Sequence, residues 1–195
     1  MITFLVSGEI DLELKIIEGL ERISEIFRIQ LWRVSLKLHL NPTQSLILLS
    51  LHKHLNLTQK DLQNIISIDK TTLSKSLKSL EEKILIERIL DPNDQRKKYI
   101  QLTSKGKKIA KKINTFYNVF LPILEKSKNI SLEDLYEFIY NFIYNAYKHN
   151  YIDTQKMCFN CKFLQIKEQK YYCKYLEKIL EKKDIKINCK DFQDK

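Results

Sequence analysis

The sequence predicts a mainly α-helical protein with one short hairpin and a small cysteine-rich extension at its C-terminal end. Only three glycines and three prolines occur in 195 residues, which favours long helices over irregular structure. Apolar residues recur at steps of three and four in several segments of residues 1–148, which is the spacing of one helical face. All four cysteines lie in the last part of the chain. We therefore expect a helical domain at residues 1–148 and a separate extension at residues 149–195.

A long first helix is predicted over residues 10–39. One face of this helix carries the apolar residues Leu12, Ile16, Leu20, Ile23, Phe27, Leu31, Val34 and Leu38. This stripe extends well past an average helix length. Two interpretations stay open, because the face can pack on a second subunit or form a long core helix within one subunit.

Three shorter helices should follow the first one. They are expected at residues 42–55, 59–66 and 70–83. Asn41 and Pro42 are suited to the start of the first of these, since Asn caps helices well and Pro fits the first helical position. Thr58 and Asp69 should cap the other two, which a tight turn at residues 67–68 separates.

The residue pattern then changes from helical to extended. Two strands are expected at residues 84–90 and 97–102, joined by the turn-forming stretch Asp91-Pro92-Asn93-Asp94. Further helices are predicted over residues 105–121, 131–148 and 175–183. The second of these has an aromatic-rich face.

Two short helices joined by a tight turn and followed by a basic hairpin form a winged helix-turn-helix, so we expect residues 58–104 to read DNA. The second short helix would enter the major groove. The residues left outside its apolar stripe are the candidate DNA contacts: Lys70, Thr71, Thr72, Ser74, Lys75 and Lys78. The hydroxyl groups could touch bases, whereas Lys75 and Lys78 are better placed for phosphates. Arg96, Lys97 and Lys98 lie at the hairpin tip, where an arginine can enter a narrow minor groove.

The distribution of charge agrees with this assignment. The chain carries a formal net charge of +10, and residues 58–112 alone hold fourteen basic and seven acidic side chains, a net charge of +7. Neutralising DNA phosphates requires such an excess. A generally lysine-rich composition is the alternative explanation, so charge by itself does not decide between them.

Three stretches of the sequence resemble the MarR family of dimeric winged-helix regulators: LNPTQSLILLSL, LTQKDLQNIISIDKTTLSKSLKSLEEKILIER and DPNDQRKKYIQLTSKGKKI. The resemblance covers roughly residues 10–148 and is strongest in the wing, at Asp94, Arg96, Leu102-Thr103 and Gly106. It implies that Arg96 reaches the minor groove and that Asp94 holds the arginine or the hairpin in place. It also implies a homodimer, built by the first and last helices, on a pseudo-palindromic site in double-stranded DNA.

Two positions depart from the family pattern. Gln95 stands where an arginine is common, which weakens the charge of the wing. Ile84 stands where a glycine is common, directly after the predicted recognition helix. A left-handed backbone is costly for a β-branched residue, so we expect a different exit from this helix.

The cysteines are spaced as Cys158-x2-Cys161-x11-Cys173-x15-Cys189. Such clustering in an intracellular chain indicates a metal site rather than disulfides. We expect these four residues to hold an iron–sulfur cluster of the 4Fe–4S type, because one close pair and two distant cysteines resemble the spacing in high-potential iron–sulfur proteins. Structural zinc and free, oxidisable thiols remain as alternatives.

The predicted function is a cytoplasmic, sequence-specific DNA-binding transcription regulator without a membrane segment. Its DNA affinity would be controlled by the cluster, in response to redox state, oxygen or iron. A regulator with a structural zinc and a small-molecule effector, or a winged-helix protein-interaction module that does not bind DNA, are the alternatives. An enzyme is not expected, since no nucleophile–base set, phosphate loop or histidine metal motif is recognisable.

Overall fold

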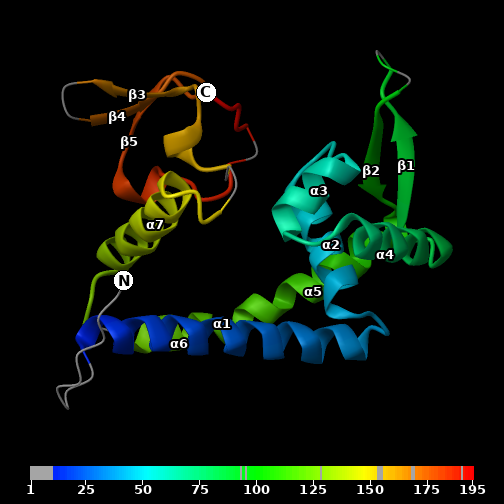
Figure 1. Cartoon of the computed structure of the whole chain (residues 1–195), viewed down its shortest axis with the longest axis horizontal. Helices are drawn as coiled ribbons and strands as arrows, with labels where there is room; N and C mark the ends of the chain where they lie inside the picture. Colours follow the sequence, from blue (N-terminus) through cyan, green and yellow to red (C-terminus); the bar gives the residue numbers. More distant parts are fainter. Residues whose placement is uncertain are drawn as a thin grey trace, which may run out of the picture.

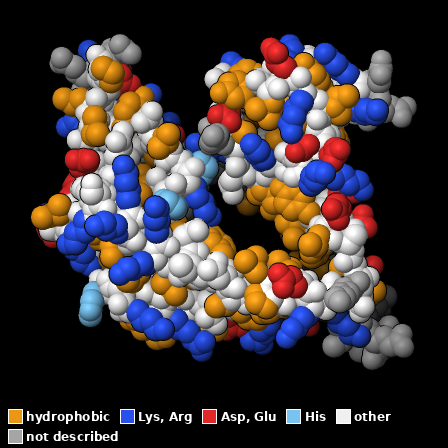
Figure 2. Space-filling view, turned by 180° about the vertical axis from the view of Figure 1, so that it is seen from behind, with side chains coloured by type: hydrophobic (Ala, Val, Ile, Leu, Met, Phe, Trp, Pro, Cys, Tyr) orange, Lys and Arg blue, Asp and Glu red, His pale blue; other side chains and the backbone are white. Residues whose placement is uncertain are grey.

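A computed structural model describes residues 11–92, 94, 96–127, 129–152, 156–167, 170–189 and 191–195. These residues form helices, a two-stranded antiparallel sheet and a three-stranded antiparallel sheet. The long helix α1 (Leu12–Lys37) runs along one edge of the molecule, and two halves rise from it (Figure 1). One half contains α2 to β2, and the other contains α7 and the cysteine-rich segment. A space-filling view shows an opening between these halves (Figure 2).

The three helices after α1 agree closely with the sequence prediction. They are α2 (Pro42–Lys53), α3 (Gln59–Ile66) and α4 (Lys70–Glu82). The side chain of Asn41 accepts the backbone N–H of Gln44, and that of Thr58 accepts the backbone N–H of Asp61. In both capping boxes the third helical residue bonds back to the backbone of the cap, which satisfies donors that a helix start leaves open.

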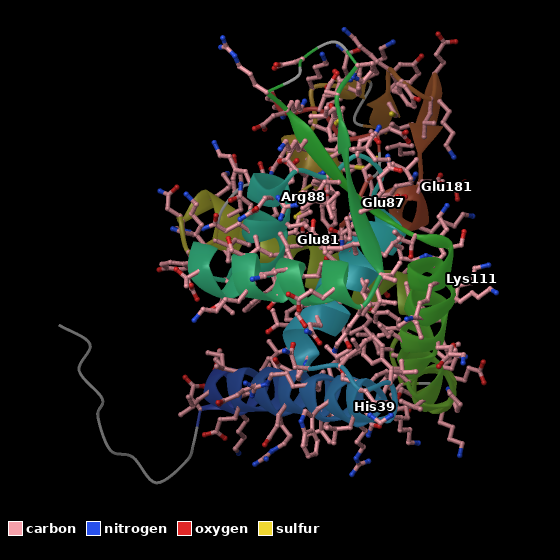
Figure 3. The ribbon with its side chains drawn as sticks, turned by 90° about the vertical axis from the view of Figure 1, so that its right-hand side faces the viewer. His39, Glu81, Glu87, Arg88, Lys111 and Glu181 are labelled. Carbon is pink, nitrogen blue, oxygen red and sulfur yellow. The ribbon has the colours of Figure 1, made fainter. Side chains whose placement is uncertain are left out.

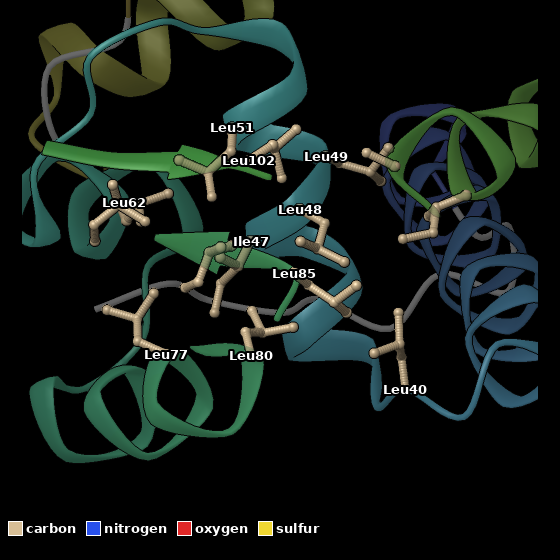
Figure 4. Close-up of a cluster of buried hydrophobic side chains, with 14 of the residues drawn as sticks. Leu40, Ile47, Leu48, Leu49, Leu51, Leu62, Leu77, Leu80, Leu85 and Leu102 are labelled. Atoms are coloured by element: carbon tan, nitrogen blue, oxygen red, sulfur yellow. The ribbon is translucent and has the colours of Figure 1, made fainter. Parts of the chain in front are cut away.

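One apolar core joins these helices to the hairpin (Figure 4). Its fully buried members from the helices include Ile47, Leu48, Leu62, Leu77 and Leu80. They occupy the inward face that the three- and four-residue spacing predicts. This shared core sets the position of α4 relative to the hairpin.

The hairpin consists of β1 (Ile86–Leu90) and β2 (Lys98–Leu102), with Ile86 opposite Leu102 and Leu90 opposite Lys98. Burial falls from the base to the tip, because Ile86 and Leu102 lie in the core whereas Leu90 is exposed. The N–H of Ile100 also donates to the carbonyl of Leu57, at 2.8 Å. The hairpin base is therefore anchored to the turn between α2 and α3, and the tip projects from the body.

The expectation of an altered exit from α4 is wrong. Ile84 has a φ of 57°, the left-handed conformation that a glycine would adopt. The N–H of Ile84 donates to the carbonyl of Glu81 and that of Leu85 to the carbonyl of Leu80, at 2.8 and 2.9 Å, which is a Schellman motif. Leu80 and Leu85 are both buried beside each other in the core, so packing outweighs the local cost at Ile84.

The helix predicted over residues 105–121 is shorter than expected. The structure has α5 (Ser104–Asn114), a 3-10 turn (Thr115–Val119) and α6 (Leu121–Lys126) in this region. Pro122 lies in the first turn of α6 and does not end a helix, because its missing N–H costs nothing there. The following helix α7 (Leu132–Lys148) agrees with the prediction.

The helix predicted over residues 175–183 is absent. Instead, β3 (Leu164–Lys167), β4 (Lys170–Cys173) and β5 (Lys178–Leu180) form a meander, flanked by 3-10 turns at Cys158–Asn160 and Lys182–Asp184. Cross-strand pairing of Tyr171 with Leu180 places the latter in the small core of this half. The spacing of apolar residues in this short segment is compatible with either a helix or a strand. Pairing between the strands selects the extended form.

Helix α1 is buried within the subunit only towards its C-terminal end, at Leu31 and Ser35. Ile16 and Ile23, on the predicted apolar face, remain 44% and 51% exposed. Phe27 stacks on Phe120 with 4.0 Å between ring centroids. The N-terminal part of the stripe, at Leu12, Ile16 and Ile23, is therefore exposed in the described part of the chain, whereas Leu31, Val34 and Leu38 pack in or against the core. No helix in that part has the length and apolar character of a membrane span.

Candidate nucleic-acid interface and cysteine pocket

Helix α4 presents a polar face to solvent because its apolar face is anchored in the core. Leu73, Leu77 and Leu80 are fully buried. All six residues predicted to contact DNA from this helix are exposed: Lys70, Thr71, Thr72, Ser74, Lys75 and Lys78. The structure thus brings these candidate contacts together on one surface.

The start of α4 is held by Asp69, whose carboxylate accepts the backbone N–H of Thr72 at 2.8 Å. Hydrogen bonding with the side chain of Thr72, and next with its backbone N–H, lowers the pKa of Asp69 below its ordinary value. The sequence did not predict one further contact of α4. The side-chain amide of Gln59 on α3 donates to the hydroxyl of Ser74, at 2.8 Å. Gln59 therefore orients a hydroxyl on the outer face of α4.

The end of α4 is tied to the turn between α1 and α2. The Nζ atom of Lys83 donates to the carbonyl of His39 at 2.9 Å and to the side-chain oxygen of Gln44 at 3.3 Å. Gln44 also donates to the hydroxyl of Ser79, at 3.0 Å. These polar contacts hold the end of α4 against the turn after α1 and the first turn of α2.

The wing tip is organised by carboxylates. The side chain of Asp94 accepts the backbone N–H of Arg96 at 3.0 Å, and that of Asp91 accepts the hydroxyl of Tyr99 at 2.7 Å. Among the described contacts, Asp94 thus supports the hairpin backbone. Arg96, Lys97 and Lys98 are all exposed. Gln95, where the family commonly has arginine, lies outside the described residues.

Arg88 is a basic residue of the hairpin that sequence reasoning left unassigned. Its Nε donates to the carboxylate of Glu81 on α4 at 2.6 Å, and the two side chains lie close together in Figure 3. This ion pair joins the wing to α4. Both side chains are about one-third exposed, so solvent screens the pair and its main effect is on geometry.

The other predicted site lies in the opposite half of the molecule. One pocket is lined by all four cysteine side chains, together with apolar residues such as Leu164 and Leu180. Cys158, Cys161, Cys173 and Cys189 are all free thiols. Cysteines that are separated by up to 31 positions in sequence are thus brought to one place by the fold.

Backbone groups surround the thiol of Cys158. The backbone N–H of Lys186 donates to its Sγ atom at 3.2 Å, and the N–H of Cys158 donates back to the carbonyl of Lys186 at 3.0 Å. Burial raises the pKa of the Cys158 thiol, and the neighbouring thiols of Cys189, Cys161 and Cys173 raise it further. Four clustered thiolates would need a bound cation to compensate their charge.

Among the described residues, no group of three or more His, Cys, Asp or Glu side chains is placed so that it could hold a metal ion as it stands. The shared pocket therefore supports the grouping of the four cysteines but not a formed coordination sphere. The identity of any bound metal stays a prediction.

The cysteine-rich segment packs against α7. Phe159 lies between Tyr140 and Tyr144, with ring centroids 4.3 and 4.7 Å away. The hydroxyl of Tyr136 donates to the carbonyl of Ile185 at 2.7 Å, and Lys182 pairs with Glu137. A change at the pocket would therefore reach α7 directly.

Comparisons with known proteins agree with this fold. The MarR family model matches residues 40–98, and no curated protein sequence matches the chain significantly. Staphylococcus aureus MepR in its DNA-binding conformation is 24% identical, with a TM-score of 0.60 over 68% of this chain and 96% of MepR. A MepR–DNA complex is 23% identical, with a TM-score of 0.55 over 72% and 99% of the two chains. MarR from E. coli is 22% identical, with a TM-score of 0.52 over 70% of this chain and 96% of MarR. What this chain shares with these solved structures is the winged-helix fold.

Proposed function

We propose that this chain is a homodimeric transcription regulator that binds double-stranded DNA, with α4 in the major groove and the wing in the adjacent minor groove. The observation that carries this proposal is one continuous exposed surface of hydroxyl and amine groups on α4, beside a basic wing, within a segment that matches the MarR family model. A polar helix face next to a basic hairpin suits both base and phosphate contacts.

The salt dependence of DNA binding tests this proposal. DNA selected by the protein from a random-sequence library is the probe, because the operator is not known from the chain. Arg96→Ala and Lys75→Ala should each weaken binding about tenfold and lower the slope of log K against log salt by about 0.9. Lys170→Ala, on β4, removes the same charge far from α4 and serves as the control.

Three outcomes are informative. Loss of binding in the first two variants but not in the control supports the assigned surface. Equal loss in all three would point to diffuse attraction by net charge. Failure to select any DNA would favour a winged-helix module that binds a protein partner.

Dimerisation is supported by the exposed apolar residues of α1, of which Ile16 and Ile23 are examples. Contiguous exposed apolar surface of this kind marks interaction sites in soluble proteins. Ile23→Asp should therefore shift the molar mass measured by light scattering towards that of one chain. Glu18→Ala, on an exposed position of the same helix, should leave the molar mass unchanged.

We further propose that the four cysteines hold an iron–sulfur cluster that controls DNA affinity, with structural zinc as the alternative. Support comes from the single pocket that all four free thiols line and from its contact with α7. The protein should be purified without oxygen and its visible absorption, iron and zinc measured. DNA binding is then compared before and after oxidation. A colourless zinc protein with unchanged binding would rule out the sensor and leave the regulator intact.

A further inference from the structure

Ser74 lies in the middle of α4, on its outer face. It follows the buried Leu73, and its own side chain is exposed. Lys70 and Lys78 are each one helical turn away from it, because residues four positions apart lie on the same side of a helix. A short, uncharged hydroxyl between two long amines is therefore placed to reach a base edge while the amines reach phosphates.

The hydroxyl of Ser74 is held in place by α3. Helix α3 packs against α4, and α4 packs against the first strand of the wing (Figure 1). Gln59 is the first residue of α3, directly after the capping residue Thr58, and its side chain is half-buried. The Nε2 atom of Gln59 donates to Oγ of Ser74 at 2.8 Å. This bond joins the two helices of the helix-turn-helix on the side that carries the candidate DNA contacts.

A second amide–hydroxyl pair on α4 has a different setting. The Nε2 atom of Gln44 donates to the hydroxyl of Ser79 at 3.0 Å, and the side-chain oxygen of Gln44 also accepts from Lys83 at 3.3 Å. Gln44 is only 5% exposed, so this pair braces the inner side of α4. In the described part of the chain, by contrast, the side chain of Gln59 bonds only to the exposed Ser74. The outer pair is therefore accessible to a ligand.

The direction of the outer bond decides what the hydroxyl of Ser74 does. A serine hydroxyl both donates and accepts, whereas an amide N–H only donates. Because Gln59 donates to Oγ, the O–H of Ser74 is left to donate outwards, and a hydrogen bond received strengthens a hydrogen bond given. In the major groove, N7 of adenine and of guanine is an acceptor, whereas cytosine presents only a donor.

We propose that Gln59 is a positioning residue for base recognition, which makes Ser74 a hydrogen-bond donor to N7 of one purine in each half-site of the DNA. This inference rests on the proposed DNA-binding function and adds to it the base edge that one residue recognises. Cytosine is disfavoured at that position, because its amino group and the O–H of Ser74 are both donors.

The test replaces single purines by 7-deazapurines, which lack the N7 acceptor and keep the base-pairing edge. The full-length protein first selects its DNA from a random-sequence library, and each purine of one half-site is then replaced in turn. For every replacement, the Kd for modified DNA is divided by the Kd for unmodified DNA. Uniform effects of charge on DNA affinity cancel in this ratio. The wild type should give a ratio of about five at the purine that Ser74 contacts, which corresponds to the loss of one hydrogen bond.

Two variants and one matched control assign this ratio to the pair. Ser74→Ala should lower the ratio at that purine to about one and leave the ratios at the other purines unchanged. Gln59→Glu should do the same, because a carboxylate only accepts and turns the O–H of Ser74 towards α3. A carboxylate also suits the first turn of a helix, so this variant should fold. Gln63→Ala, one turn later on α3, should keep the ratio of about five.

The results that would overturn the proposal differ from those that would overturn the proposed function. If the protein selects DNA but Ser74→Ala lowers the ratio at no purine, Ser74 does not donate to N7. If Gln59→Glu keeps the ratio of about five, or if Gln63→Ala loses it as well, Gln59 does not position the hydroxyl. If the protein selects no DNA at all, the proposed regulator fails and this inference fails with it.

Discussion

The contact of Gly106 with the end of α4 gives the sharpest prediction about stability. Gly106 is the third residue of α5, and its N–H donates to the hydroxyl of Thr103 at 3.0 Å. A Cβ atom added to Gly106 would lie 1.9 Å from the carbonyl oxygen of Leu85, whereas real Cβ atoms essentially never approach within 3.0 Å. The backbone at Leu85 would therefore have to move by roughly 1 Å.

That carbonyl has little freedom to move. It accepts the N–H of Thr103 at 3.1 Å, and the hydroxyl of Thr103 donates to the neighbouring carbonyl of Ile84 at 2.8 Å. Overpacking costs about 1–3 kcal/mol, and an N–H left without its acceptor costs about 1–3 kcal/mol. We therefore expect Gly106→Ala to lower the free energy of unfolding by about 2–6 kcal/mol.

Gly19→Ala is the control, because nothing lies within 4 Å of a Cβ atom added to Gly19. This exposed position in the middle of α1 should gain about 1 kcal/mol from the higher helix propensity of alanine. Urea denaturation followed by circular dichroism, at one protein concentration, measures both variants. An unchanged unfolding midpoint for Gly106→Ala would refute the close contact between α5 and Leu85.

Three further predictions concern the helix ends and pH. In the same urea experiment, Ile84→Gly should be about 1 kcal/mol more stable than Ile84→Ala, because only glycine adopts the left-handed backbone without strain. The side chain of Ile84 is 66% exposed, so its removal costs the two variants little and equally. Equal unfolding midpoints would contradict this prediction. Asp69→Ala should destabilise α4 and weaken DNA binding, whereas Asp69→Asn should retain the cap and most of the DNA affinity. Equal loss of DNA affinity in both variants would contradict the role of the cap. The lowered pKa of His54 means that its stabilising contribution is complete above its unfolded pKa and is lost as pH falls through the folded value. The thermal unfolding midpoint measured between pH 7.5 and 5 should therefore fall less in His54→Gln than in the wild type or in His52→Gln, and identical profiles would refute it.

The helices from α2 to α4 could be predicted from the sequence almost to the residue. Strong caps at Asn41, Thr58 and Asp69 mark their starts, and leucines at helical spacing mark their buried faces. Local signals of this kind do not depend on distant parts of the chain. The exposed face of α4 follows from the same pattern, because the core determines which residues are left outside.

Longer-range contacts were not predictable in the same way. The hydrogen bond from Gln59 to Ser74 and the contacts of Lys83 with His39 and Gln44 join residues that the sequence separates by 15 to 44 positions. No local pattern marks such partners. A groove on the winged half likewise combines the end of α2, β2 and α5, so its basic residues could not be predicted as a group: His52, His54, Lys107 and Lys111.

The sequence by itself determined the helical character of the chain, the polar face of α4, the basic wing and the presence of four cysteines near the C-terminal end. Periodicity, capping and charge are local properties, so they can be recognised in the sequence without knowledge of the fold. Only the tertiary structure decided that Ile84 adopts the glycine-like exit from α4, since packing of Leu80 and Leu85 outweighs the strain there. It also replaced a predicted helix by the meander that carries Cys173, because pairing between strands is a contact that no short apolar pattern encodes.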